Sequence, residues 1–216
     1  MKNSKHAVET RNLSISWGAI NVLDQLNFEL IEGEKLAIVG PSGSGKSTIL
    51  KILAGLIMPT KGELKIFGEK QKYLRLDQNN PPDVRLVFQN PALLGSLTVE
   101  ENVGFLLKRN KNLTKNLIQE IVSECLAEVG LFNVENKLPN ELSGGMQKRV
   151  SFARALITDQ TLNANTKPLL LFDEPTAGLD PIASSRIEDL INKTNNKANG
   201  SSIVVSHVLS TIERTS

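Results

Sequence analysis

The first part of the chain alternates between apolar and polar positions, which is typical of strands with one buried face. The segments VETRNLSISW and VLDQLNFELIEG both alternate, with turns predicted at residues 18–19 and 32–33. The run EKLAIVG is apolar without alternation, which indicates a strand buried on both faces. Residues 8–36 are therefore expected to form strands.

After a glycine-rich loop the pattern changes to helical spacing. STILKILAGLI has apolar residues at positions 49, 50, 53, 56 and 57, which predicts a helix that ends at Pro59. GELKIFG then predicts a short strand, and DVRLVFQ predicts a second buried strand. A strand, a glycine loop and a helix thus follow one another directly.

Residues 92–150 carry a helical pattern throughout. The longest helix is expected in KNLTKNLIQEIVSECLAEVGL, with Thr114 as N-cap and Gly130 as the stop signal. SFARALI predicts another helix. The basic run at 108–112 is interpreted as a solvated face.

The strand and helix alternation returns in the last third. KPLLLFDE predicts a buried strand, IASSRIEDLINKT a helix capped by Asp180 with Pro181 at its first position, and SIVVSH a last strand. TDQTLNANTK, before the first of these, is expected to be a polar loop. The predicted fold class is α/β: a parallel core sheet with crossover helices, an N-terminal antiparallel β-subdomain and an inserted helical subdomain.

The glycine loop GPSGSGKST follows the G-x-x-x-x-G-K-[ST] pattern between a strand and a helix. Glycines let successive N–H groups point inward at an anion, and the helix adds its positive N-terminal end. Lys46 reaches the β- and γ-phosphates, the Ser47 hydroxyl ligates Mg²⁺, and Thr48 adds a phosphate contact. The alternative, a glycine-rich turn without a ligand, leaves the lysine and hydroxyls unexplained. The predicted ATP-binding residues here are Gly40, Pro41, Ser42, Gly43, Ser44, Gly45, Lys46, Ser47 and Thr48.

Two adjacent acids end the apolar run LLLFDE. Beside a phosphate-binding loop, Asp173 is expected to hold Mg²⁺ through water, and Glu174 to orient or deprotonate the attacking water. The alternative is an ordinary surface turn after a core strand.

Composition narrows the function classes. The chain of 216 residues has 25 basic and 23 acidic residues, a balance that does not favour nucleic-acid binding. Cys125 is the single cysteine, so no internal disulfide is possible. The sequence has no run of 18 apolar residues, so it predicts no membrane span. Its N-terminus has no apolar segment, so it predicts no secretory signal. Any membrane role is expected to require a partner.

The segment LSGGMQKRV, 142–150, lies about thirty residues before the DE strand and resembles the signature sequence of ATP-binding cassette (ABC) ATPases. Other motifs of that family occur in the family's order. Gln89 resembles the Q-loop, Asp180 the D-loop, and His207 the switch histidine. The resemblance implies one ABC ATPase domain over 1–216, with core and β-subdomain in about 8–91 and 150–216 and a helical subdomain in about 92–149.

The family resemblance also assigns roles. Trp17 stacks on adenine, which is worth about 1–3 kcal/mol by analogy with base stacking. Gln89 contributes an oxygen for Mg²⁺ or water, and His207 contacts the γ-phosphate. The implied catalytic set is Glu174, His207, Lys46 and Gln89, and the implied metal set is Ser47, Gln89 and Asp173.

The signature implies a partner as well. Ser143, Gly144 and Gly145 are expected at a helix N-terminus, with Gln147 and Asp180 also among the ATP-contacting residues. In the family this end meets the ATP of the opposite subunit. One chain has one glycine loop and one signature, so a second copy of the chain is expected, with two ATP between the copies. Met146 stands where many members have glutamine, a departure that leaves the signature intact.

Three stretches resemble one branch of the family. They are similar to segments of the ATPases of lipid-trafficking importers, the MlaF type and its cyanobacterial and chloroplast relatives. The three stretches are FQNPALLGSLTVEENVGFLL, LPNELSGGMQKRVSFARALI with the polar insert that follows it, and DEPTAGLDPIASSRIEDLI. The resemblance implies a membrane permease and an MCE-type protein as partners, phospholipid or phosphatidic acid as cargo, and a peripheral place in the cytoplasm or plastid stroma. The family continues past the switch histidine, whereas this sequence stops at Ser216, so the carboxyl-terminal part looks short.

Other functions stay open at the level of sequence. An importer of amino acids or metal ions is the second candidate for cargo. A non-transport ABC ATPase is a further class, although translation factors carry two cassettes and repair proteins carry long coiled coils. A regulatory subunit without turnover is disfavoured because all four residues expected to bind or act on ATP are present: Lys46, Asp173, Glu174 and His207.

Overall fold

The structure is a computed structural model that describes residues 5–157, 168–198, 200–207 and 215. Contacts divide the chain into two compact units. The first comprises Met1–Leu86, Lys167–Pro175 and Ile191–Ser216, and the second comprises Val87–Thr166 and Thr176–Leu190. The second unit therefore takes in residues 150–166 and 176–190, which the family resemblance assigns to the core.

An antiparallel sheet forms the N-terminal part of the first unit. Its strands are β1 (His6–Trp17), β2 (Ile20–Ile31), β4 (Lys61–Ile66) and β5 (Glu69–Lys70), in the order β2-β1-β4-β5. β1 and β2 form a hairpin in which Trp17 pairs with Ile20. The alternation in residues 8–31 thus predicts the strands and their turn correctly.

A second, parallel sheet has the order β3-β8-β7-β6. Its strands are β3 (Lys35–Val39), β6 (Val84–Val87), β7 (Leu169–Asp173) and β8 (Ser201–Ser206). Every residue of β7 and β8 is buried, and for β7 the apolar run predicts this. β3 and β6 are only partly buried, so the expectation of two fully buried strands there is wrong. Both lie at the edges of this sheet, where neighbouring strands cover one side only.

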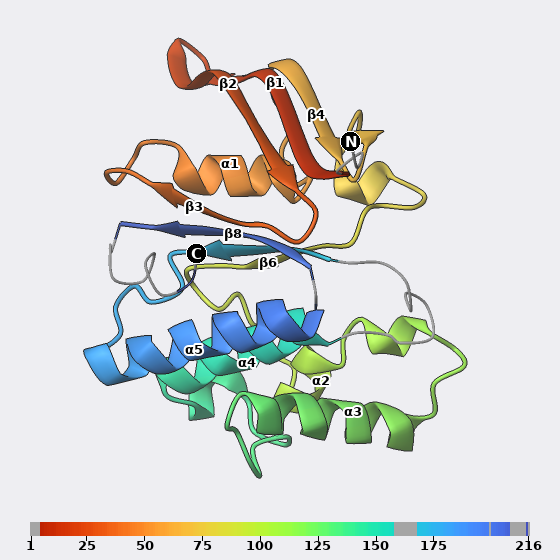
Figure 1. Ribbon diagram of the computed structural model, residues 1–216. Coiled ribbons are helices and arrows are strands. Elements are labelled where there is room, and N and C mark those ends of the chain that lie inside the picture. The colour runs from red at the N-terminus through yellow and green to blue at the C-terminus, as the bar shows by residue number, and fades with distance from the viewer. Residues whose placement is uncertain (1–4, 158–167, 199, 208–214, 216) are drawn as a thin grey trace. The chain divides into compact units, whose positions relative to one another are not determined.

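Helix α1 (Lys46–Leu53) lies between the two sheets (Figure 1). Its apolar face joins a core with residues of β1, β4, β7 and β8, including Leu50, Leu13 and Leu171. The helix ends earlier than predicted, because Gly55 rather than Pro59 stops it. The N–H of Gly55 bonds to Ile52 O at 2.9 Å, and the N–H of Leu56 bonds to Lys51 O at 2.9 Å. This pair of bonds is the Schellman motif. A short 3₁₀ turn, η1 (Arg75–Asp77), also belongs to this unit.

Helices form the second unit. They are α2 (Val99–Val103), η2 (Leu107–Arg109), α3 (Lys115–Glu128), η3 (Pro139–Glu141) and α4 (Gly144–Leu156). Thr114 caps α3, because its hydroxyl accepts the N–H of Leu117 at 3.3 Å. Gly130 follows the end of α3, as predicted. α4 packs against α2 and α3 (Figure 1).

Helix α5 (Pro181–Ala198) begins as its sequence predicts. The Asp180 carboxylate accepts the N–H groups of Ile182 and Ala183 at 3.0 and 2.9 Å, which confirms the cap. The predicted polar loop at 158–167 lies outside the described residues. Within the described part of the chain, the helices are all too short or too polar to cross a membrane.

Candidate functional site

Three segments of the first unit meet at one edge of the parallel sheet. β3, β7 and β8 run parallel, with Val39 beside Ser206 and Asp173 beside Val205. The glycine loop after β3, Glu174 after β7 and His207 after β8 therefore emerge at the same carboxyl edge. Ligands of open α/β sheets bind at such an edge.

The glycine loop leads into α1 through Gly45, the N-cap, whose φ is 89°. A Cβ on Gly45 would lie 2.8 Å from the Leu23 side chain and 3.0 Å from the Val22 carbonyl oxygen, so a larger residue does not fit. The loop is thus held tightly against β2. The opening N–H groups of α1 have no helical acceptors and form the positive end that an anion needs.

Lys46 is buried, with 7% of its surface exposed. Its ammonium donates to the carbonyl oxygens of Gly40 and Pro41 at 2.8 and 2.9 Å and lies 3.8 Å from Glu174 Oε1. The positive charge is therefore concentrated inside the glycine loop, as its sequence predicts.

Ser47 and Asp173 contact each other directly. The Ser47 hydroxyl donates to Asp173 Oδ1 at 2.8 Å. Burial raises the pKa of Asp173, the Ser47 hydrogen bond opposes that rise, and the nearby Glu174 carboxylate adds to it. The raised pKa means that the surroundings of Asp173 stabilise its negative charge less than water does. A bound cation would stabilise that charge.

A hydroxyl and one carboxylate are hard oxygen ligands of the kind that Mg²⁺ takes. Among the described residues no group of three or more histidine, cysteine or acidic side chains gathers as a metal cage. Sites that share Mg²⁺ with substrate phosphates and water have this composition. Ser47 and Asp173 therefore fit the ion.

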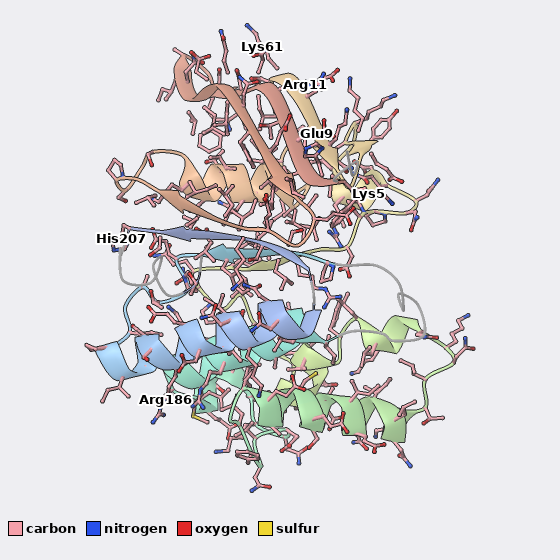
Figure 2. The ribbon with its side chains drawn as sticks, viewed as in Figure 1. Lys5, Glu9, Arg11, Lys61, Arg186 and His207 are labelled. Carbon is pink, nitrogen blue, oxygen red and sulfur yellow. The ribbon has the colours of Figure 1, made fainter. Side chains whose placement is uncertain are left out.

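Glu174 lies between two nitrogen groups. Its Oε2 is 2.7 Å from His207 Nδ1, and its Oε1 faces Lys46. The backbone of Glu174 is left-handed, with φ 45°, and its N–H donates to Val205 O at 3.0 Å. Such strain in a non-glycine residue costs about 1–3 kcal/mol and tends to occur at functional positions. His207 is 59% exposed and lies at the end of β8 (Figure 2).

Trp17 is 57% exposed at the end of the hairpin. It pairs with Ile20, two residues before Val22, which contacts Gly45. The hairpin end that carries Trp17 is therefore close to the start of α1. An exposed indole beside a phosphate-binding loop is placed to stack on a base.

The remaining candidate residues belong to the second unit. Gln89 is exposed directly after β6. Ser143 caps α4, since its hydroxyl accepts the N–H of Met146 at 3.3 Å, and this confirms a helix N-terminus at the signature. Gln147 donates from its amide to Pro139 O at 2.9 Å. The ATP contacts of Gln89, Ser143, Gln147 and Asp180 stay predictions.

Gly144 and Gly145 have open space around them. Among the described residues, no atom lies within 4 Å of the Cβ that either residue would carry, and neither has a positive φ. A helical glycine costs about 0.5–1 kcal/mol relative to alanine. The fold of the chain therefore does not require these glycines, whereas close approach of something outside the chain would.

Cationic side chains of α4 hold loops of the second unit, among them Arg154 and Lys148, and the sequence pattern does not single them out. The Arg154 guanidinium donates to Ala92 O at 2.9 Å and Pro91 O at 3.2 Å. The Lys148 ammonium donates to Ala177 O at 2.5 Å. Basic residues on amphipathic helices usually face solvent, so their spacing gives no signal of such contacts.

A comparison with protein families decides the classification. The family model described as ABC transporter matches residues 23–177. The chain belongs to the ABC transporter family. It carries the ATPase domain of that family, with the parallel core sheet, N-terminal antiparallel sheet and helical unit that the sequence predicts.

Individual relatives agree with the family. The chain is 49% identical to "Protein TRIGALACTOSYLDIACYLGLYCEROL 3, chloroplastic" of Arabidopsis thaliana, over 96% of this chain and 63% of that protein. It is 38% identical to the "Intermembrane phospholipid transport system ATP-binding protein MlaF" of Haemophilus influenzae, over 94% of this chain and 75% of that protein. The chain thus spans somewhat less than two thirds of the first relative's length.

A solved structure confirms the fold. A dimeric post-hydrolysis state of an ATP-binding cassette bound to ADP and Pi superimposes with a TM-score of 0.81 at 32% identity, over 96% of this chain and 90% of that chain.

Proposed function

We propose that this chain is the ATP-binding and ATP-hydrolysing subunit of an ABC transporter. The observation that carries the proposal is the convergence of Lys46, the Ser47–Asp173 pair and the Glu174–His207 pair at one sheet edge. Phosphoryl transfer to water requires a cation near the phosphates, oxygen ligands for Mg²⁺ and a carboxylate that positions the water. Lys46 supplies the first, the Ser47–Asp173 pair the second, and Glu174 beside His207 the third.

The chain's own residues divide the work. The glycine loop and the N-terminal end of α1 bind the phosphates. The Lys46 ammonium, which donates to the Gly40 and Pro41 carbonyl oxygens, donates to phosphate oxygens instead when ATP binds. Bound Mg²⁺, held by Ser47, Asp173 and Gln89, would neutralise phosphate charge. Glu174 orients the attacking water and accepts its proton, while His207 holds the Glu174 carboxylate at 2.7 Å and contacts the γ-phosphate. Trp17 stacks on the adenine.

A second copy of the chain completes each ATP site in this proposal. The open space at Gly144 and Gly145 supports the approach of a nucleotide from outside the chain. The dimeric cassette with ADP and Pi supports the same arrangement by similarity. ATP binding then favours the closed dimer, and hydrolysis releases it.

We further propose lipid as the cargo. The names of the two curated relatives concern an intermembrane phospholipid transport system and trigalactosyldiacylglycerol. By that similarity the chain docks on a separate membrane permease that works with an MCE-type protein and moves phospholipid or phosphatidic acid. The chain would then lie peripherally on the cytoplasmic or plastid-stromal side of the membrane.

Substitution of Glu174 tests the ATPase proposal. Glu174→Gln keeps the side-chain shape but cannot accept a proton, so phosphate release should fall by about 100-fold or more. ATP binding should persist, and ATP-bound dimer should accumulate in light scattering after size exclusion. Glu124→Gln, an exposed change on α3, is the control and should behave as the unaltered chain does. A Glu174→Gln variant that still turns over, or that stays monomeric with ATP, would refute the proposal.

Co-purification tests the cargo. Tagged chain from solubilised native membranes, followed by mass spectrometry, should recover a multi-span permease together with an MCE-type protein. Recovery of a permease with a periplasmic solute-binding protein would reject lipid and retain the ATPase. Recovery without any permease would reject the transport role.

A further inference from the structure

Lys148 connects helix α4 to a turn of the second unit. It lies on α4, one turn after the signature glycines, and its ammonium donates to the Ala177 carbonyl oxygen at 2.5 Å. The side chain is partly buried, and burial lowers the pKa of Lys148. A charge-assisted hydrogen bond is strengthened where water is partly excluded.

The carbonyl that Lys148 binds belongs to a tight turn. The N–H of Leu179 bonds to Thr176 O at 3.2 Å, and Gly178, in the third position of this turn, has φ 73°. A positive φ there is required by a type II turn, which favours glycine. The turn's own hydrogen bond uses the Thr176 carbonyl and leaves the Ala177 carbonyl for a donor from outside the turn.

The turn leads directly into Asp180. The Asp180 side chain accepts the first N–H groups of α5, and its carbonyl oxygen accepts the N–H of Ser184 at 2.9 Å. Asp180 is thus rigidly fixed to α5 on one side and to the turn on the other. Lys148 anchors that turn to α4.

The same part of α4 also fixes the signature. Ser143 caps the helix, and the Gln147 amide donates to Pro139 O and Leu142 O at 2.9 and 3.3 Å. Arg149, the next basic residue, donates instead to Gly130 O at 2.9 Å, at the end of α3. Lys148 is therefore the basic residue of this segment that reaches the Asp180 turn.

We propose that Lys148 is a positioning residue that locks the Asp180 turn to the signature end of α4, so that Ser143–Gly145 and Asp180 meet the second copy as one preformed surface. The inference rests on the proposed function, since it assigns both segments to the ATP-loaded dimer. It does not place Lys148 in contact with ATP. Loss of the lock should slow turnover in the dimer and leave nucleotide binding by the first unit unchanged.

The test compares Lys148→Met with Lys148→Arg. Methionine keeps the apolar stem and removes the donor, whereas arginine keeps a donor. Lys148→Met should lower kcat about 10- to 100-fold, as misplacement of a distant positioning group does. ATP affinity, measured by Trp17 fluorescence, should change by less than about twofold, because Lys148 does not touch the phosphates. Amide exchange at Ile182 and Ala183 should accelerate, and Lys148→Arg should restore both kcat and protection.

Lys115→Met, an exposed change at the start of α3, is the matched control and should alter neither measurement. The inference is overturned if Lys148→Met retains kcat, if exchange at 182–183 is unchanged, or if arginine restores nothing. Should Lys148→Met melt below the assay temperature, Lys148→Leu, which also lacks a donor, replaces it under the same criteria. If the unaltered chain has no ATPase activity, the proposed function and the catalytic part of this inference are both wrong. Amide exchange at Ile182 and Ala183 still tests whether Lys148 anchors the turn.

Discussion

Two neighbouring carboxylates, Asp173 and Glu174, have different environments within one site. Asp173 ends β7, is buried and is hydrogen-bonded to Ser47, whereas Glu174 turns away on a left-handed backbone toward His207. The apolar run that ends in two acids predicts both residues. It does not predict the φ of Glu174 or the 2.7 Å contact with a residue 33 positions away, because those depend on the pairing of β7 with β8.

Burial of Asp173 predicts a gain in stability when its charge is removed. Between its usual pKa and the raised pKa, the folded state binds more protons than the unfolded state, so stability falls as pH rises through that window. Asp173→Asn should therefore raise the melting temperature at pH about 8 by about 2–4 °C, equivalent to about 1 kcal/mol. The gain should shrink as the pH approaches about 4, the usual range of an aspartate.

Thermal melting without Mg²⁺ or nucleotide measures this effect. Asp77→Asn, an exposed change, is the control and should shift the melting temperature little. Mg²⁺ with ATP should stabilise the unaltered chain and fail to stabilise Asp173→Asn. A lower melting temperature for Asp173→Asn at pH about 8 would show that the Asp173 charge is stabilising, contrary to this argument.

Trp17 is the chain's single tryptophan, so its fluorescence reports on one position. Stacking on adenine should quench or shift the emission when ATP is added. Trp17→Ala should weaken ATP binding about 5- to 150-fold, corresponding to a stacking energy of about 1–3 kcal/mol. Isothermal titration measures the affinity, with Tyr73→Ala, another exposed aromatic, as control. Emission insensitive to ATP, with normal affinity for Trp17→Ala, would mean that adenine binds elsewhere.

Among the elements, those whose neighbours are close in sequence are predicted best. The hairpin of β1 and β2, the Thr114 cap and the Asp180 cap depend on local spacing, and each occurs where expected. The burial of β3 and the end of α1 are predicted wrongly. The apolar residues of β3 predict a strand, and β3 pairs with β8. Its place at the edge of the sheet, which leaves it partly exposed, follows from the order of all four strands. Pro59 is a strong helix stop, yet Gly55 comes first and closes the helix.

The loop before α2 depends on one buried amide. Asn102 is fully buried, and its Oδ1 accepts the N–H of Leu94 at 2.8 Å. Its Nδ2 lies 3.0 Å from each of the carbonyl oxygens of Leu94, Leu97 and Thr98, which share its two hydrogens. Asn102→Ala would leave these buried backbone groups without partners. We expect a loss of about 2–4 kcal/mol of unfolding free energy, since each unsatisfied group costs about 1–3 kcal/mol.

Urea unfolding followed by circular dichroism measures the loss. Asn116→Ala, an exposed change in the first turn of α3, is the control and should be close to neutral. A decrease below about 1 kcal/mol for Asn102→Ala would show that water replaces the amide easily and that the loop is not held by it.

At the scale of the whole molecule, the proposed dimer assigns complementary halves of each ATP site to the two units. The first unit holds Lys46 and Glu174, and the second holds the signature glycines, which their own surroundings leave open. If each ATP lies between the glycine loop of one copy and the signature of the other, two differently damaged chains should repair each other. Lys46→Ala removes the phosphate-binding cation, and Gly144→Asp fills the open space at the signature.

Each variant alone should lack ATPase activity. Gly144→Asp should still fold, because no atom of the described part of the chain lies within 4 Å of the new Cβ. In a mixed dimer one ATP site is intact. The chain with Gly144→Asp supplies an unaltered glycine loop to that site, and the chain with Lys46→Ala supplies an unaltered signature. Random pairing makes half the dimers mixed, so an equimolar mixture should recover about a quarter of full activity if the sites act independently. Mixing Lys46→Ala with Lys46→Met is the control and should recover none. If the two variants carry different affinity tags, sequential purification on both tags isolates the mixed dimers. Mixed dimers isolated in this way that lack ATPase activity would refute the arrangement in which each ATP lies between two copies.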